Sequence, residues 1–175
     1  MNEERVILVD KEDNVIGTMF KMEAHEKAVL HRAFSVFILN RKGELMLQQR
    51  ALHKYHSPGL WTNTCCSHQR EGEGNIEAGT RRLKEEMGFK TALEELFSFT
   101  YKAFFDNGLT EHEFDHVMLG YYDGFPKINS EEVASWKWMS LTKIKIDMEK
   151  YPENYTAWFK IIFKRFYNHT KSIKH

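Results

Sequence analysis

The stretch SHQREGEGNIEAGTRRLKEEMG, residues 67–88, decides the fold of this chain. Its second part, residues 75–87, is predicted to be a helix, because Asn75 is of a type that caps helices at their start and Gly88 of a type that ends them. Near the end of this helix Glu86 follows Arg82 by four residues, so the two side chains share a face. They form either a solvent-exposed ion pair worth about 0.3–0.5 kcal/mol, or part of a site where a carboxylate holds a hard cation against phosphate oxygens.

On both sides of this helix, apolar runs alternate with turn residues, which predicts several strands. Strands are expected at residues 6–9, 34–39, 44–50, 96–105, 116–122 and 133–139, and a short extended segment at residues 61–68. A turn at residues 41–43 predicts that the second and third of these strands form a hairpin. Further helices are expected at residues 141–150 and 155–168, and a short helix or turn at residues 22–30. Because strands and helices mix without regular alternation, the pattern favours an α+β or mixed α/β fold.

Length and composition favour a single folded domain spanning residues 1–175. Hydrophobic residues make up 42% and aromatic residues 14% of the chain, which is enough for a core and excludes a disordered chain. The 25 basic residues balance the 25 acidic ones, so no overall positive field points to nucleic acid. The stretch MNEERVILVD lacks the pattern of a signal peptide, and no apolar run approaches the roughly 18–20 residues of a membrane span. We therefore expect a cytoplasmic protein with no nucleic-acid or membrane partner.

The two cysteines of the chain, Cys65 and Cys66, are adjacent. Neighbours in sequence rarely form a disulfide, so both are expected to be free thiols, which fits a reducing compartment. In an extended segment, neighbouring side chains point to opposite faces, so at most one thiol enters a given pocket. A thiol close to histidines can act as a nucleophile or in proton transfer, although chemistry alone favours two cysteines that fill the core.

Five histidines and glutamates that are spread along the sequence have the chemistry of metal ligands. They are His25, His31, His68, Glu111 and Glu113. Nitrogen and carboxylate donors suit magnesium, manganese, iron or zinc. Glu111 and Glu113 are two residues apart, so on a strand they face the same side, where their repulsion is costly unless a cation or a proton lies between them. The chain has nine histidines, however, and spacing alone favours ordinary surface residues.

Four basic residues, Lys21, Arg50, Lys54 and Arg82, have the charge that a diphosphate requires. Taken one by one, each is better explained as an ordinary surface residue. Their interpretation therefore depends on whether the fold brings them together.

Six segments, in this order, resemble the type 1 isopentenyl-diphosphate isomerases. They are GTMFKMEAH (17–25), LHRAFSVFILN (30–40), LMLQQRAL (45–52), SPGLWTNTCCSH (57–68), RRLKEEMG (81–88) and TEHEFDH (110–116). The resemblance covers residues 6–166. It implies a Nudix fold, with a central mixed sheet flanked by helices, and an enzyme that interconverts isopentenyl and dimethylallyl diphosphate in isoprenoid biosynthesis.

Residues 67–88 also resemble the Nudix signature GX5EX7REUXEEXGU. With Gly88 aligned, matches are found at Glu73, Arg81, Glu85 and Glu86. Two positions depart from the signature: Ser67 replaces a glycine, and Arg82 replaces the glutamate after the arginine. Nudix hydrolases use their helix glutamates to hold metals, so this loss disfavours hydrolysis, whereas an arginine suits binding an intact diphosphate. The alternatives are a Nudix pyrophosphatase and a non-catalytic Nudix-like binding module.

The resemblance assigns roles to individual residues. The catalytic residues it implies are Cys66, Glu113 and Tyr101, with Cys65 as a packing residue. The implied metal ligands are His25, His31, His68, Glu111 and Glu113 for Mn²⁺, Mg²⁺ or Zn²⁺, and Glu86 for a Mg²⁺ shared with the diphosphate. The implied substrate-binding residues are Lys21, Arg50, Lys54, Arg82 and Trp158. The reaction would proceed by metal-dependent protonation and deprotonation through a carbocation-like state, in a monomer or a weakly associated homodimer.

Overall fold

The computed structural model describes residues 4–173, and within this range nine strands form one mixed sheet. The strands are β1 (Arg5–Val9), β2 (Val15–Phe20), β3 (His31–Leu39), β4 (Glu44–Arg50), β5 (Trp61–Thr62), β6 (Cys65–Ser67), β7 (Leu93–Phe104), β8 (Thr110–Tyr121) and β9 (Val133–Ser140). The helices are α1 (Lys21–Lys27), α2 (Asn75–Met87), α3 (Leu141–Lys150) and α4 (Ala157–Ile173), with a short 3-10 turn η1 (Pro152–Asn154). Residues 1–3 of the amino-terminal stretch lie outside the described residues. No helix in residues 4–173 is long and apolar enough to cross a membrane.

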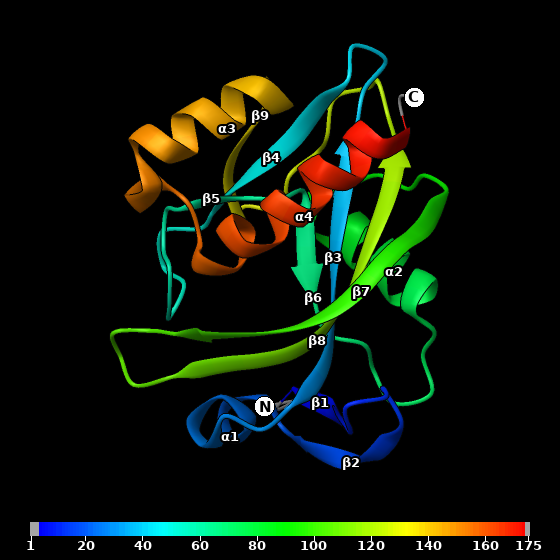
Figure 1. The fold of residues 1–175 in the computed structure, drawn as a ribbon, viewed down its shortest axis with the longest axis vertical. Helices are drawn as coiled ribbons and strands as arrows, with labels where there is room; N and C mark the ends of the chain where they lie inside the picture. Colours follow the sequence, from blue (N-terminus) through cyan, green and yellow to red (C-terminus); the bar gives the residue numbers. More distant parts are fainter. Residues whose placement is uncertain (1–3, 174–175) are drawn as a thin grey trace.

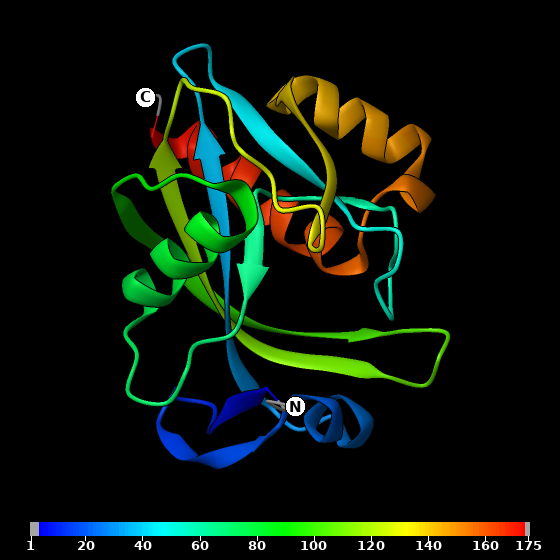
Figure 2. The same ribbon diagram turned by 180° about the vertical axis from the view of Figure 1, so that it is seen from behind.

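Helices α4 and α2 cover opposite faces of the sheet (Figure 1, Figure 2). The core side of α4 consists of buried aromatic and aliphatic residues, and the face of α2 that packs on the sheet includes Leu83 and Met87. Strand β3 is buried on both faces, with Phe34 and Val36 packing against the α2 side and Phe37 against the α4 side. Because both faces of β3 are buried, its sequence is an almost continuous run of apolar residues. The sheet therefore has a hydrophobic core on each side.

Strand β3 organises the end of the sheet where polar residues gather. It pairs in parallel with β8, which places His31 opposite Glu113, and antiparallel with β6, which places Ser35 opposite Cys66. Strand β8 in turn forms a long hairpin with β7, in which Tyr101 lies opposite Glu113. This hairpin extends well beyond the rest of the sheet (Figure 1). Segments that are distant in the sequence thus meet at one point.

The predicted helix at residues 75–87 is confirmed, but the predicted role of Asn75 as its cap is wrong. Gly74 is the N-cap, and the backbone N–H of Gly74 donates a hydrogen bond to the Glu77 side chain. The Asn75 amide instead donates to Glu95 (2.8 Å). Gly88 ends the helix in the left-handed conformation, as predicted.

Three strand predictions need correction. The hairpin of β3 and β4 is reduced to one residue pair, Leu39 opposite Leu45, because β4 runs on against β9 and β5. Strand β8 begins at Thr110, six residues before the predicted start at His116. The first part of this strand is rich in polar residues, so a search for apolar residues does not detect it. Strand β2 was not predicted, because it is an edge strand with little buried surface.

Gly88, the residue that ends helix α2, is expected to tolerate substitution poorly. Its φ is +75°, and a Cβ at this position would clash with the backbone carbonyl of Lys127. Gly88→Ala is expected to destabilise the fold by about 2 kcal/mol or more, lowering Tm by roughly 4 °C or more. Gly43→Ala is the matched control, because Gly43 also has a positive φ (+76°) but open space around it. Equal Tm values for the two variants would contradict the steric argument.

Candidate active site

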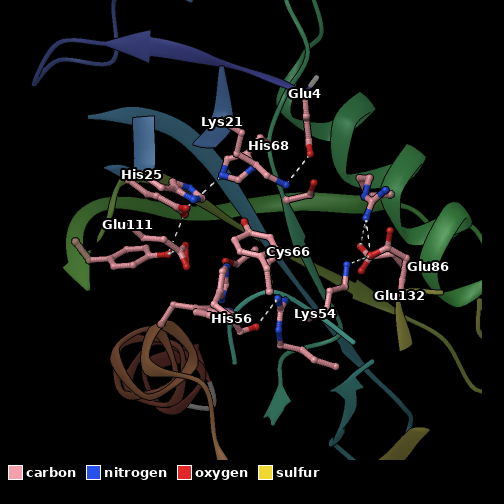
Figure 3. Close-up of a pocket in the computed structure, with 18 residues that line it drawn as sticks. Glu4, Lys21, His25, Lys54, His56, Cys66, His68, Glu86, Glu111 and Glu132 are labelled. Atoms are coloured by element: carbon pink, nitrogen blue, oxygen red, sulfur yellow. Dashed lines mark hydrogen bonds and ion pairs between the residues drawn. The ribbon is translucent and has the colours of Figure 1, made fainter. Parts of the chain in front are cut away.

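A cavity of about 140 Å³ opens where the polar ends of β3, β6 and β8 meet. It is lined by the four predicted cations, by the thiol of Cys66, and by Tyr101 and Trp158. It is also lined by Glu4, Ser35, His56 and Glu132, which sequence reasoning had not selected. Figure 3 shows Cys66 between His25 and Glu111 on one side and Lys54, Glu86 and Glu132 on the other.

Four of the five predicted metal ligands form one compact group. Ligand atoms of His25, His31, His68 and Glu113 all lie within 4.8 Å of one another. His31 Nε2 lies 3.4 Å, and His68 Nε2 3.2 Å, from the same oxygen, Glu113 Oε1. His25 belongs to α1, and the left-handed Ala28 (φ +55°) turns the chain back so that His31 can join it.

The ring nitrogens of this group are suited to hold a divalent cation. Both nitrogens of His25 and Nε2 of His31 are buried and have no hydrogen-bond partner among the described residues. His31 Nδ1 donates to the carbonyl of Val29 (2.9 Å), which leaves Nε2 as the free electron-pair donor. Burial, with the neighbouring His68 and His31, lowers the pKa of His25 to about 3, so its ring is neutral. Unpartnered buried polar atoms are costly, and a bound cation would remove this cost.

The fifth predicted ligand, Glu111, lies beside this group without being part of it. Tyr101 Oη donates to Glu113 Oε2 (2.9 Å) and lies 3.4 Å from Glu111 Oε2. Burial and the charge of Glu113 raise the pKa of Glu111 well above its usual range. Burial acts in the same direction on the pKa of Glu113, but the contacts of its carboxylate with the rings of His31 and His68 outweigh burial and lower that pKa. The two carboxyls therefore differ in protonation, as expected for neighbours on one strand face.

Of the two adjacent thiols, only Cys66 lines the cavity. Burial and the nearby Glu86 raise the pKa of its thiol, so Cys66 carries its proton. Cys65 is fully buried on the α2 side of the sheet, and its thiol donates to Glu86 Oε2 (2.9 Å). The prediction that at most one thiol faces the pocket agrees with this placement. The hydrogen bond from Cys65 to Glu86 was not predicted.

The four predicted cations converge on the cavity from separate elements. Lys21 pairs with Glu4 (2.7 Å), and Arg50 Nη2 donates to the carbonyl of His56 (3.2 Å). Lys54 pairs with Glu132, and Arg82 lies between Glu85 (2.8 Å) and Glu86 (3.4 Å). The Nε atoms of both arginines are buried and lack a hydrogen-bond partner among the described residues.

Aromatic rings form the remaining wall of the cavity. The guanidinium of Arg50 lies 5.1 Å from the centre of the Trp158 ring. The His56 ring stacks on Phe105 (4.7 Å) and lies edge-on to Trp158 (5.6 Å). Burial and Arg50 lower the pKa of His56 to about 3, so this ring is neutral. No sequence pattern distinguishes His56 from the exposed His53, which explains why it was missed.

Comparison with known proteins agrees with this geometry. Residues 29–159 match the NUDIX domain family. The chain is 51% identical to isopentenyl-diphosphate Delta-isomerase 2 of Aromatoleum aromaticum, over 89% of this chain and 82% of that protein. It is 49% identical to isopentenyl-diphosphate Delta-isomerase of Serratia proteamaculans, over 93% of this chain and 90% of that protein.

Solved structures share the fold at low sequence identity. A protein from Deinococcus radiodurans superposes with a TM-score of 0.77 at 21% identity, covering 93% of this chain and 98% of that one. A MutT protein from Methanosarcina mazei gives a TM-score of 0.67 at 23% identity, covering 81% of this chain and 96% of that one. The predicted fold, a central mixed sheet flanked by helices, is confirmed. The chain belongs to the NUDIX domain family and, within it, to the family of the isopentenyl-diphosphate Delta-isomerases.

Proposed function

We propose that the chain is an isomerase that interconverts isopentenyl diphosphate and dimethylallyl diphosphate, with Cys66 and Glu113 as its proton-transferring pair. One observation carries the proposal: the thiol of Cys66 and the carboxylate of Glu113 line the same cavity, together with four cations. The substrate follows from the names of the relatives, which are about half identical in sequence over most of the chain.

The reaction requires an acid and a base acting on the same short carbon chain. A proton adds to the terminal alkene carbon and another leaves the neighbouring methylene, so the double bond moves by one position and no net proton is consumed. Because the substrate has no carbonyl to acidify that methylene, the change passes through a tertiary, carbocation-like state. Cys66 and Glu113 are the groups proposed for the two transfers. The Tyr101 hydroxyl, which donates to Glu113, orients its carboxylate and offers a route for its proton.

Aromatic side chains would protect the charged state. The electron-rich face of Trp158 can stabilise a positive charge by about 2 kcal/mol when water is excluded. Trp158 is only 3% exposed, and the stacked rings of His56 and Phe105 lie next to it. This enclosure matters because water would trap the cation as an alcohol.

We further propose that divalent metals take part. His25, His31, His68 and Glu113 would hold one ion, Mn²⁺, Mg²⁺ or Zn²⁺, with Glu111 as an additional ligand, and Glu86 would hold a Mg²⁺ shared with the diphosphate. When bound, these ions supply positive charge that neutralises the phosphate oxygens and orders the Glu113 carboxylate. Lys21, Arg50, Lys54 and Arg82 would anchor the diphosphate, and this remote binding would position the alkene.

The chain's other expected properties remain proposals. We propose a single enzymatic domain over residues 1–175, active in the cytoplasm as a monomer or a weak homodimer. Two free cysteines in the described structure fit a reducing compartment.

The decisive experiment is an assay with isopentenyl diphosphate in deuterated water. The proposal expects dimethylallyl diphosphate as product, with deuterium entering both isomers. Phosphate release from nucleoside diphosphate derivatives, without any isomer formed, would instead identify a hydrolase. Binding of isopentenyl diphosphate without turnover or exchange would identify a non-catalytic binding module.

Metal removal is expected to affect both activity and stability. Treating the enzyme with a chelator should lower turnover by about 100-fold or more, because Glu113 and the histidines lose their shared cation. Adding back Mn²⁺, Zn²⁺ or Mg²⁺ should raise Tm, since a ligand that binds only the folded state stabilises it.

His25→Ala should lose both the bound metal and the increase in Tm. The control is His53→Ala, which should keep both, because the His53 side chain is 61% exposed. A chelated enzyme with full activity and unchanged Tm would contradict the proposed metal site.

A further inference from the structure

Glu132 is an acidic residue in a cavity that is proposed to bind an anion. It lies in the turn just before β9, and no motif of the sequence includes it. Its side chain is 24% exposed and lines the cavity. Figure 3 shows it beside Lys54 and Glu86, on the side of Cys66 away from His25. A carboxylate at this place would repel a diphosphate, so its presence requires an explanation.

The Glu132 carboxylate contacts two cations that come from different parts of the chain. It accepts a hydrogen bond from Lys54 Nζ and lies 3.6 Å from Arg82 Nη2. Burial acts to raise the pKa of Glu132, but Lys54 and Arg82 outweigh it and lower that pKa, so the carboxylate is ionised. The negative charge of Glu132 is thus shared by Lys54 and Arg82, the two cations that are proposed to bind the diphosphate.

The backbone around Glu132 is fixed to the same two segments. The Glu132 carbonyl accepts from the N–H of Ala51, and the Ala51 carbonyl accepts from the N–H of Lys54. In the same turn, the Asn129 N–H donates to the carbonyl of Glu86 at the end of α2, and the Glu132 N–H donates to the Asn129 carbonyl (3.0 Å). The carboxylate is therefore held at the junction between the Lys54 loop and helix α2.

We propose that Glu132 is a positioning residue that holds Lys54 and Arg82 close together as a preformed diphosphate-binding pair. Two like charges that converge on one anion site repel each other before the substrate arrives. A carboxylate that contacts both cations compensates this repulsion and fixes both side chains, which reduces the ordering that binding would otherwise require. The inference rests on the proposed binding of a diphosphate.

In the opposite role, Glu132 would compete with the diphosphate for Lys54 and Arg82, and the diphosphate would have to displace its carboxylate. The contacts favour positioning. Lys54 uses one of its three N–H groups on Glu132 and keeps two donors for a second anion, and Arg82 also lines the cavity. The two roles predict changes of opposite sign in affinity, which makes them separable.

The test compares Glu132→Gln with the adjacent Glu131→Gln in the full-length enzyme with Mg²⁺. Glu131 is the matched control, because its side chain is 84% exposed and its carboxylate lies near His53 rather than the cavity. We measure KM and kcat for isopentenyl diphosphate and, by calorimetry without substrate, the Kd of inorganic diphosphate. For Glu132→Gln we expect KM and Kd to rise about tenfold while kcat falls less than about threefold. Glu131→Gln should leave KM, kcat and Kd unchanged.

Two further variants guard against a purely structural effect. Glu132→Asp keeps the charge with a shorter reach and should recover part of the lost affinity. In a Lys54→Met background, Glu132→Gln should raise KM much less than in the wild type, because the charge it positions has gone. An unchanged or lower KM in Glu132→Gln, or a loss confined to kcat, would overturn the inference.

The experiment also separates this inference from the proposed function. If the wild-type enzyme does not isomerise isopentenyl diphosphate, the proposed function is wrong. The Kd of inorganic diphosphate, measured for the wild type and Glu132→Gln, still tests the role of Glu132. An active wild type whose Kd for inorganic diphosphate is the same in Glu132→Gln removes the inference alone.

Discussion

Cys66→Ala is expected to lower turnover of isopentenyl diphosphate by about a thousandfold or more, since proton transfer by a positioned side chain contributes roughly 10²–10⁴-fold. The physical reason is that Cys66 supplies the thiol that lines the cavity and is proposed to exchange a proton with the substrate, whereas alanine has no proton to exchange. Substrate should still bind, because the cations that anchor the diphosphate are untouched. The measurement is kcat in a coupled isomerase assay, with substrate affinity determined by calorimetry.

Cys65→Ala is the matched control for this prediction. It removes the neighbouring thiol, which lies on the opposite face of the strand and donates to Glu86. We expect this variant to keep most of its activity, because the Cys65 thiol does not line the cavity and takes no part in the proposed proton transfer. Equal activity of the Cys65 and Cys66 variants would remove Cys66 from its proposed role.

Glu113→Gln is expected to have a comparably large effect, with turnover again falling by about a thousandfold. The amide is nearly the same shape but cannot accept a proton at neutral pH, and it exchanges one of the two carboxylate oxygens for an NH2 group. The loss should persist at metal concentrations that restore full occupancy. Metal content and kcat therefore have to be measured on the same sample.

Glu94→Gln is the control on the same hairpin, because Glu94 is exposed on β7 and does not line the cavity. It should keep wild-type kcat. Recovery of Glu113→Gln activity by added metal alone would show that Glu113 acts as a ligand and not in proton transfer.

The parts of the fold that could be predicted are those encoded locally. Helix α2 has its predicted limits because Gly88 readily adopts the left-handed backbone that ends a helix, and the residues before it have helical spacing. Glu111 and Glu113 both point to the buried face, as the two-residue period of a strand dictates. The cation, thiol and carboxylate sets likewise meet in one cavity, as the resemblance to the isomerases implied.

What could not be predicted depends on pairings between distant segments. The hydroxyl of Ser35 donates to Asp115 (2.9 Å) inside the sheet, a contact created only by the alignment of β3 with β8. The role of Glu132 depends on a turn that brings it against Lys54 and Arg82. Asn75 was misjudged because the same residue type can cap a helix or bridge to a neighbouring strand, and only tertiary contacts decide.

The parallel alignment that sets His31 against Glu113 has a consequence for how the protein reaches its native state. A slip of one residue between β3 and β8 would turn Glu113 to the other face and dismantle the ligand group. A cation at the site proposed above would therefore bind the correctly paired chain in preference to a misaligned one. At a concentration 100 times its Kd this preference would be worth about 2.7 kcal/mol, so a supply of the metal during folding would favour the native pairing of β3 with β8.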